Sequence, residues 1–189
     1  MIKVKQLKKD NLVGKTVPTN KNGHAGRAIE DLLEGQGYKI NRQGAVPDMQ
    51  GLNVEVKTRD LNATSPQTIG TMLLDDIKIT PYPVSSIAGK LKQQLRVKTK
   101  DRVVVESRIW DFSDLYIQSL IETSYEIARQ KIIAGCQDKY IPGGDYGYFE
   151  KCTNSNNSYA WRMSQSMMDK LETMSGNSST FNTHFEAVK

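Results

Sequence analysis

Three residues whose types and spacing suit phosphodiester chemistry stand close together in the chain: Asp48, Glu55 and Lys57. Carboxylate oxygens are the ligands that a hard divalent cation such as Mg²⁺ prefers. Such a cation lowers the pKa of a bound water molecule and neutralises charge on a phosphate under attack. A lysine on the same face can contact that water or the phosphate. The set therefore predicts metal-dependent hydrolysis, with Asp48 and Glu55 as metal ligands and Lys57 beside the reacting groups.

The same pattern also has an ordinary structural explanation, and both explanations stay open at this point. Charged residues alternate with valines along any strand that has one solvated face, and an aspartate after a proline is common in turns. Two neighbouring features favour chemistry: Glu30 lies on a predicted helix before the strand, and a basic cluster follows it. Glu30 is expected to point towards the metal ligands, and its alternative is an ion pair with Arg27 on the same helix.

Hydrophobic periodicity predicts the elements that position these residues. Helical spacing predicts a helix over residues 24–34, with Asn22 as its cap and Gly35 after its end. Strict alternation predicts a half-buried strand over residues 52–58, which places Glu55 and Lys57 side by side on its polar face. Further strands are expected at 68–73, 76–80, 95–97, 102–109 and 146–149. Helices are expected at 85–91 and at 114–134, the latter capped by Ser113 and ended by Gly135, and residues 159–174 are expected to begin extended and end helical.

This mixture of elements predicts one α/β domain over residues 1–174 and a flexible, Ser/Asn/Thr-rich tail over 175–189. A chain of 189 residues is long enough to build a hydrophobic core without disulfides or structural metal ions. Its two cysteines lack CxxC spacing, which argues against a structural zinc site or a disulfide framework. There is no apolar run of the length that a membrane span needs, and no secretory leader is evident. A cytoplasmic protein without a membrane partner is therefore expected.

The charge balance favours a polyanionic partner. The chain carries 26 basic and 21 acidic residues, a net charge of +5. Residues 85–108 alone hold seven cations against two acids, a local excess of five. Such a cluster favours binding to a phosphate backbone, because the binding releases counterions. The cations considered as DNA contacts are Lys90, Lys92, Arg96, Lys98 and, outside the cluster, Arg162.

Taken in order, these motifs resemble the core of the MutH family of DNA endonucleases. The resemblance is carried by Gly23-His-Ala-Gly26-Arg-Ala-Ile-Glu30, then Asp48, then Glu55-Val-Lys57-Thr. It extends over about residues 20–150, including the Lys90-Leu91 segment and the long helix that follows. The family contains the strand-nicking enzyme of mismatch repair and restriction endonucleases that cut at GATC. The resemblance implies a restriction-endonuclease-like PD-(D/E)xK core, a central mixed β-sheet flanked by α-helices.

The resemblance also implies an activity. It implies a Mg²⁺-dependent endonuclease, with Mn²⁺ as a substitute, that hydrolyses double-stranded DNA and leaves 5′-phosphate and 3′-hydroxyl ends. Lys90 then joins Glu30, Asp48, Glu55 and Lys57 in the catalytic set. Double-strand cutting implies a homodimer or paired binding events, whereas a monomer nicks.

Two departures from the family limit what carries over. The interval between Glu30 and Asp48 is longer than the family's, and the C-terminus is shorter. Catalysis therefore carries over better than GATC specificity or coupling to a MutL-type partner. Two other functions stay open: a DNA-binding protein that keeps the nuclease fold without cutting, and a junction-resolving nuclease.

Overall fold

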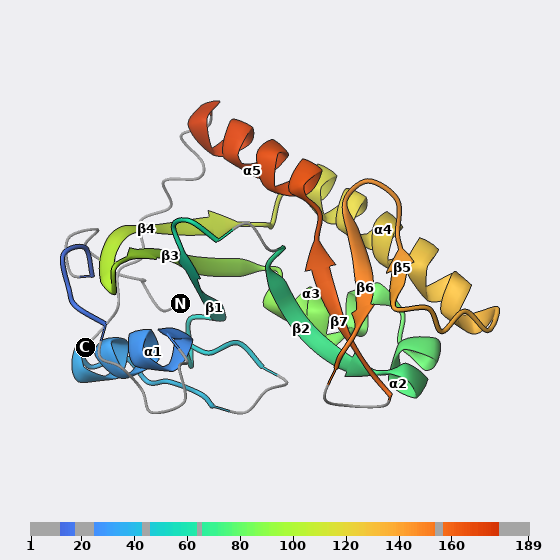
Figure 1. Ribbon diagram of the computed structural model, residues 1–189, viewed down its shortest axis with the longest axis horizontal. Helices are drawn as coiled ribbons and strands as arrows, with labels where there is room; N and C mark the ends of the chain where they lie inside the picture. Colours follow the sequence, from blue (N-terminus) through green and yellow to red (C-terminus); the bar gives the residue numbers. More distant parts are fainter. Residues whose placement is uncertain (1–11, 18–24, 43–45, 64–65, 154–156, 178–189) are drawn as a thin grey trace. The chain divides into compact units, whose positions relative to one another are not determined.

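The computed structural model describes residues 12–17, 25–42, 46–63, 66–153 and 157–177 (Figure 1). Helices and strands are mixed, which confirms an α/β protein, and the described strands form two sheets. The chain divides into two compact units. Unit 1 contains the described residues before 64 together with Lys92–Asp111, and unit 2 contains residues 66–91 and 112–177. A single domain over residues 1–174 stays a prediction.

Unit 1 is built from helix α1 (Ala25–Gly35) and a mixed sheet in the order β1-β3-β4. Strand β1 (Val54–Asp60) runs parallel to β3 (Gln93–Lys100), and β3 runs antiparallel to β4 (Val103–Asp111). The helix expected over 24–34 is confirmed, while its expected cap, Asn22, lies outside the described residues.

The strand expected over residues 52–58 begins two residues later, at Val54. The reason is a turn before it, in which Gly51 and Asn53 have φ angles of 81° and 54°. Backbone with positive φ cannot continue a strand, and glycine adopts it without steric cost. The turn reverses the chain so that Met49 pairs antiparallel with Val54.

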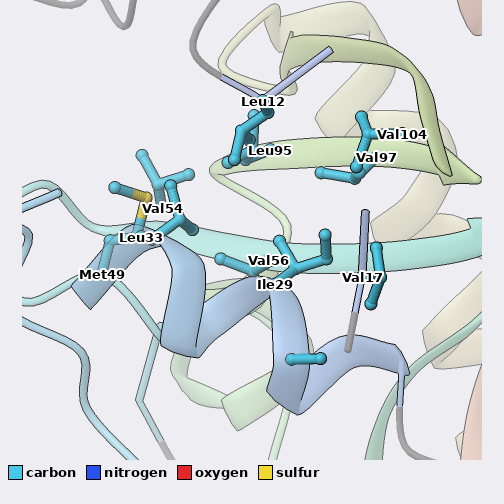
Figure 2. Close-up of a cluster of buried hydrophobic side chains, with 11 residues drawn as sticks. Leu12, Val17, Ile29, Leu33, Met49, Val54, Val56, Leu95, Val97 and Val104 are labelled. Carbon is cyan, nitrogen blue, oxygen red and sulfur yellow. The ribbon is translucent and has the colours of Figure 1, made fainter. Parts of the chain in front are cut away.

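Helix α1 covers one face of the unit 1 sheet. In Figure 2 the side chains of Ile29 and Leu33 on α1 point towards the valines of β1. Fully burying an aliphatic side chain contributes about 1.5–3 kcal/mol, so this layer accounts for much of the stability of unit 1. Since successive strand residues point to opposite faces, the charged residues between the valines lie on the face away from α1. The buried apolar cluster comprises Leu12, Val17, Ala28, Ile29, Leu33, Met49, Val54, Val56, Leu95, Val97 and Val104.

Unit 2 is built on an antiparallel sheet in the order β2-β7-β6-β5. Its strands are β2 (Thr68–Leu73), β7 (Ser158–Met163), β6 (Gly147–Lys151) and β5 (Tyr140–Pro142). Helix α4 (Leu115–Ile133) packs against β5 and β6. The remaining helices are α2 (Leu74–Ile79), the 3₁₀ turn η2 (Tyr82–Val84), α3 (Ser86–Lys90) and α5 (Gln165–Asn177).

The strand expected at residues 76–80 is wrong, because this segment belongs to α2. The alternation of Ile77 and Ile79 suggested a strand, yet Ile77 is buried whereas Ile79 is 77% exposed. Two acids in the first turn of α2 favour a helix through its dipole. At the other end, Arg129 of α4 donates to the carbonyls of Ile77 and Lys78 at 3.0 and 2.7 Å. This tertiary contact satisfies carbonyl groups that a short helix leaves open.

The ends of the long helices also differ in detail from expectation. Asp114, and not Ser113, caps α4: its carboxylate accepts hydrogen bonds from the N–H groups of Tyr116 and Ile117 at 2.9 and 3.1 Å. Gly135, with a φ of 97°, follows the end of α4 as expected. Helix α5 continues to Asn177, into the stretch expected to be a tail, and residues 178–189 lie outside the described part of the chain.

The described strands confirm the strands expected at 68–73, 95–97, 102–109 and 146–149, while β5 was not expected. Unit 2 has an aromatic core. The Trp161 ring lies 4.9 Å from Phe149 and 5.6 Å from Tyr125, measured between centroids. No helix in the described part of the chain has the length and apolar character needed to span a bilayer.

Candidate active site

Asp48 lies beside the edge of β1 that faces away from β3. The N–H of Met49 donates to the carbonyl of Val54 at 2.9 Å, and the N–H of Asn41 donates to the carbonyl of Asp48 at 2.6 Å. The Asp48 Oδ2 atom accepts a hydrogen bond from the N–H of Val56 at 2.7 Å. The carboxylate thus takes the place of a backbone partner on this strand edge. It is held against the residue that follows Glu55.

Glu55 and Lys57 form an ion pair on the face of β1 away from α1. Lys57 Nζ lies 2.6 Å from Glu55 Oε1, and the Glu55 side chain is only 2% exposed while that of Lys57 is 17% exposed. The strand is therefore more buried than the half-buried strand that the sequence predicted, because Glu55 is as inaccessible as the valines beside it. A carboxylate in such a place requires a charged or hydrogen-bonding partner. Lys57 supplies one.

Glu30 lies on α1 and is influenced electrostatically by Asp48. Partial burial raises the pKa of Glu30 above its ordinary value, and the negative charge of Asp48 raises that pKa further. The nearby guanidinium groups of Arg42 and Arg27 act in the opposite direction. Asp48 is thus the acid that acts most strongly on Glu30. That Glu30 points towards the metal ligands stays a prediction.

The expected DNA-contacting cations of unit 1 occupy different environments. Lys92 is exposed just before β3. Arg96 is 7% exposed, lies in register opposite Lys57, and places its guanidinium carbon 3.8 Å from the centroid of the Trp110 ring. Lys98 pairs with Glu106 at 3.2 Å. Of these three cations, Lys92 is the exposed one, whereas Arg96 is held in place by packing.

Lys90 and Arg162 belong to unit 2. Lys90 is the last residue of α3, and its side chain lies against Gly70 of β2. Arg162 on β7 forms an ion pair with Glu150 and donates to the carbonyl of Pro66 at 2.9 Å. Whether these two residues act together with Asp48 stays a prediction.

The donor chemistry of the cluster fits Mg²⁺. Among the residues described, no group of three or more His, Cys, Asp or Glu side chains forms a ready-made metal cluster. Mg²⁺ does not need one, since proteins commonly hold it through one or two carboxylates while water and substrate phosphate complete its shell. Asp48 and Glu55 supply two carboxylates of this kind. No soft ligand stands among them that would favour another class of metal.

Sequence reasoning missed several residues that share this sheet face. Gln94 lies opposite Glu55, and Trp110 lies opposite Gln94. A period of two runs through β3, in which Gln94, Arg96 and Lys98 alternate with apolar residues. That alternation could have shown which face they share. Nothing in it shows which residue of β1 or β4 each one meets.

Comparison with known proteins adds no independent assignment. The chain matches no family model and no curated protein. The resemblance to the MutH family therefore stays a prediction.

Proposed function

We propose that the protein is a Mg²⁺-dependent DNA endonuclease with a restriction-endonuclease-like core, similar to the MutH family. The observation that carries the proposal is the buried Glu55–Lys57 pair on a strand whose edge holds the Asp48 carboxylate. A buried ion pair adds little net stability, because the cost of desolvating both charges offsets their attraction. Charged groups gathered in this way, together with the raised pKa of Glu30, are typical of functional sites.

Each residue has a distinct role in this proposal. Asp48 and Glu55 hold the metal ion. When bound, Mg²⁺ activates water and neutralises charge on the phosphate. Lys57 contacts the attacking water or the scissile phosphate, and its ion pair with Glu55 orients the ammonium group on the polar face of β1. Glu30 acts on the same cluster through its proximity to Asp48.

The proposed core is supported by the order of the parts within unit 1. Glu30 lies on the helix that covers the sheet, Asp48 precedes the edge strand, and Glu-x-Lys stands on that strand. The sheet is mixed, as the resemblance implies. The contacts of Asp48, Glu55 and Lys57 do not depend on the fold family to which this core is assigned.

Cleavage of supercoiled plasmid in Mg²⁺ and in EDTA tests the proposal. We expect Mg²⁺-dependent conversion to open circles or linear DNA, and a loss of roughly 10²- to 10⁴-fold in Asp48→Asn. Asp75→Asn is the matched control, because Asp75 is an exposed acid on α2 that pairs with Lys78 at 2.9 Å. Thermal unfolding of both variants shows whether they are folded.

Either of two outcomes contradicts the proposal. One is full cleavage activity in folded Asp48→Asn. The other is duplex binding by the wild-type protein without cleavage in Mg²⁺ or Mn²⁺, which identifies the non-cleaving DNA-binding alternative. Open circles indicate a nickase and linear products indicate paired cuts. A preference for branched over linear duplex identifies a junction-resolving nuclease.

A further inference from the structure

Nine residues form three rows across the unit 1 sheet, on the face that points away from α1. In an antiparallel or parallel pair, residues in register lie about 5 Å apart and their side chains share a face. From β1 through β3 to β4, the rows are Glu55–Gln94–Trp110, Lys57–Arg96–Arg108 and Arg59–Lys98–Glu106. The rows become apparent only when the register of all three strands is known.

The charge of this face is strongly one-sided. Five of the nine residues are cations and two are acids, a net charge of +3. All three members of the middle row are cations. Like charges directly opposite each other on neighbouring strands destabilise a sheet. Glu55 and Glu106 pair with the two ends of the row, Lys57 and Arg108. The positive charge that remains on the face favours an anionic ligand.

The cations of the row are held in place. The Arg96 guanidinium stacks on Trp110, and its Nη1 lies 3.5 Å from Gln94 Oε1. Glu106 holds two neighbours, with Arg108 Nε at 2.5 Å and Lys98 Nζ at 3.2 Å from its carboxylate. Side chains that are already ordered lose less conformational entropy when a ligand binds. The face is therefore preorganised.

The row leads away from the proposed active site. It begins at Lys57, passes the buried Arg96, and ends at Arg108, whose side chain is 48% exposed. Neighbouring strands are about 4.8 Å apart, so the row spans on the order of 10 Å. Each strand of duplex DNA carries one charge per about 3.4 Å of axis, so a row of this length can meet more than one phosphate.

We propose that Lys57, Arg96 and Arg108 form a phosphate track, in which Arg96 and Arg108 bind the phosphates next to the one at Lys57. The DNA strand to be cut then crosses β1, β3 and β4 at right angles to them. This inference rests on the proposed nuclease function and assigns its substrate path. Such contacts fix the register of the DNA and add affinity, but they carry no sequence information.

DNA binding without metal tests the track separately from cleavage. The probe is a short fluorescein-labelled DNA duplex, and its anisotropy is measured in EDTA over a series of salt concentrations. In Arg108→Gln, we expect binding several-fold weaker and a slope of log affinity against log salt smaller by about one. Lys78→Gln is the control, because Lys78 is also a partly exposed cation paired with an acid, and lies on α2.

Arg96 needs a pair of variants because its side chain is buried. In Arg96→Met, we expect the slope of log affinity against log salt to fall by as much as in Arg108→Gln. Arg96→Lys should keep most of the slope because it keeps the charge. If Arg96→Met does not fold, the exposed Arg108 still carries the test. Slopes in folded Arg108→Gln equal to those of Lys78→Gln would overturn the track.

The two proposals fail in different ways. If Asp48→Asn abolishes cleavage while the salt slope of Arg108→Gln stays at the control value, the track is wrong and the nuclease stands. If the slope falls as expected in a protein that never cleaves, the track stands as a DNA-binding face and the nuclease is wrong.

Discussion

The two sheets of the molecule differ in the charged residues on the face that does not pack against the apolar core. Each sheet buries one face in an apolar core. On the other face of the unit 2 sheet, Arg162 forms an ion pair with Glu150 on the neighbouring strand. On the corresponding face of the unit 1 sheet, three cations stand in one row beside a buried carboxylate. Both faces contain ion pairs, but those of unit 1 leave a surplus of positive charge, and this is the face that we propose for an anionic partner.

The cores differ as well. In unit 2, Phe149 packs edge to face against Tyr125 and Trp161. Tyr125 packs at a tilted angle against Trp161 and Tyr82. Unit 1 packs aliphatic side chains between α1 and its sheet. Aromatic contacts of this geometry add stability beyond the area they bury. We therefore expect substitutions in unit 2 to act mainly on stability, and substitutions on the charged face of unit 1 to act on activity as well.

The largest effect on stability is expected at the centre of the aromatic core. Trp161→Ala removes a fully buried ring that contacts Phe149 and Tyr125, so it should cost about 3–5 kcal/mol in the free energy of unfolding. Urea denaturation measures the loss. Trp161→Phe keeps an aromatic ring and should lose less. Equal losses in the two variants would show that the edge-to-face contacts contribute little.

The next effect concerns the buried ion pair of unit 1. Lys57→Met leaves the Glu55 carboxylate buried without its ammonium partner, so we expect a cost of about 3 kcal/mol. The double variant Glu55→Gln/Lys57→Met removes both charges and should recover stability to within about 1 kcal/mol of wild type. Cleavage should stay lost by about 10²-fold or more.

Urea denaturation and plasmid cleavage measured on the same samples check this prediction. A double variant as unstable as Lys57→Met would identify the pair as a structural one. A stable double variant that still cleaves at the wild-type rate would remove the pair from the active site.

A smaller effect is expected from pH on unit 2. Burial raises the pKa of Tyr125 from 10.0 to about 12, so the folded protein holds the phenolic proton more tightly than the unfolded chain does. The stability from this group is complete below about pH 10 and is lost as the pH rises through 12. Tyr125→Phe should cost about 1 kcal/mol at neutral pH through its lost hydrogen bond to the Thr80 carbonyl.

The pH dependence itself is the sharper test. Urea denaturation from neutral to alkaline pH should show a steeper loss of stability in wild type than in Tyr125→Phe. Tyr140→Phe is the control, since Tyr140 is 51% exposed. An alkaline loss in Tyr125→Phe equal to that in wild type would show that another group is responsible.

The smallest effect is expected at the closed ion pair of unit 2. Arg162→Gln removes a partly exposed partner of Glu150, so the cost in stability should be at most about 1 kcal/mol. Its guanidinium is already held by Glu150 and the Pro66 carbonyl, so the salt slope of DNA binding should fall less than in Arg108→Gln. A fall of about one would make Arg162 a phosphate contact after all.

Local periodicity was enough to predict the elements that carry the proposed site. The helix that bears Glu30 and the strand that bears Glu55 and Lys57 follow from spacings of about 3.6 and 2 residues, which depend only on near neighbours in the chain. The segment of α2 was mistaken for a strand because six residues are too few to separate the two periods. The packing of Ile77 and the bonds from Arg129 decide for the helix.

The residue types and their spacing show which groups of unit 1 are available for chemistry: Asp48, Glu55, Lys57 and a surplus of cations. The fold is needed to see that the Asp48 carboxylate accepts a hydrogen bond at the edge of β1, that Glu55 is buried, and that Lys57 lies opposite Arg96. The reason is that strand pairing joins residues far apart in the chain. A shift of one residue in register would move every side chain of the strand to the opposite face.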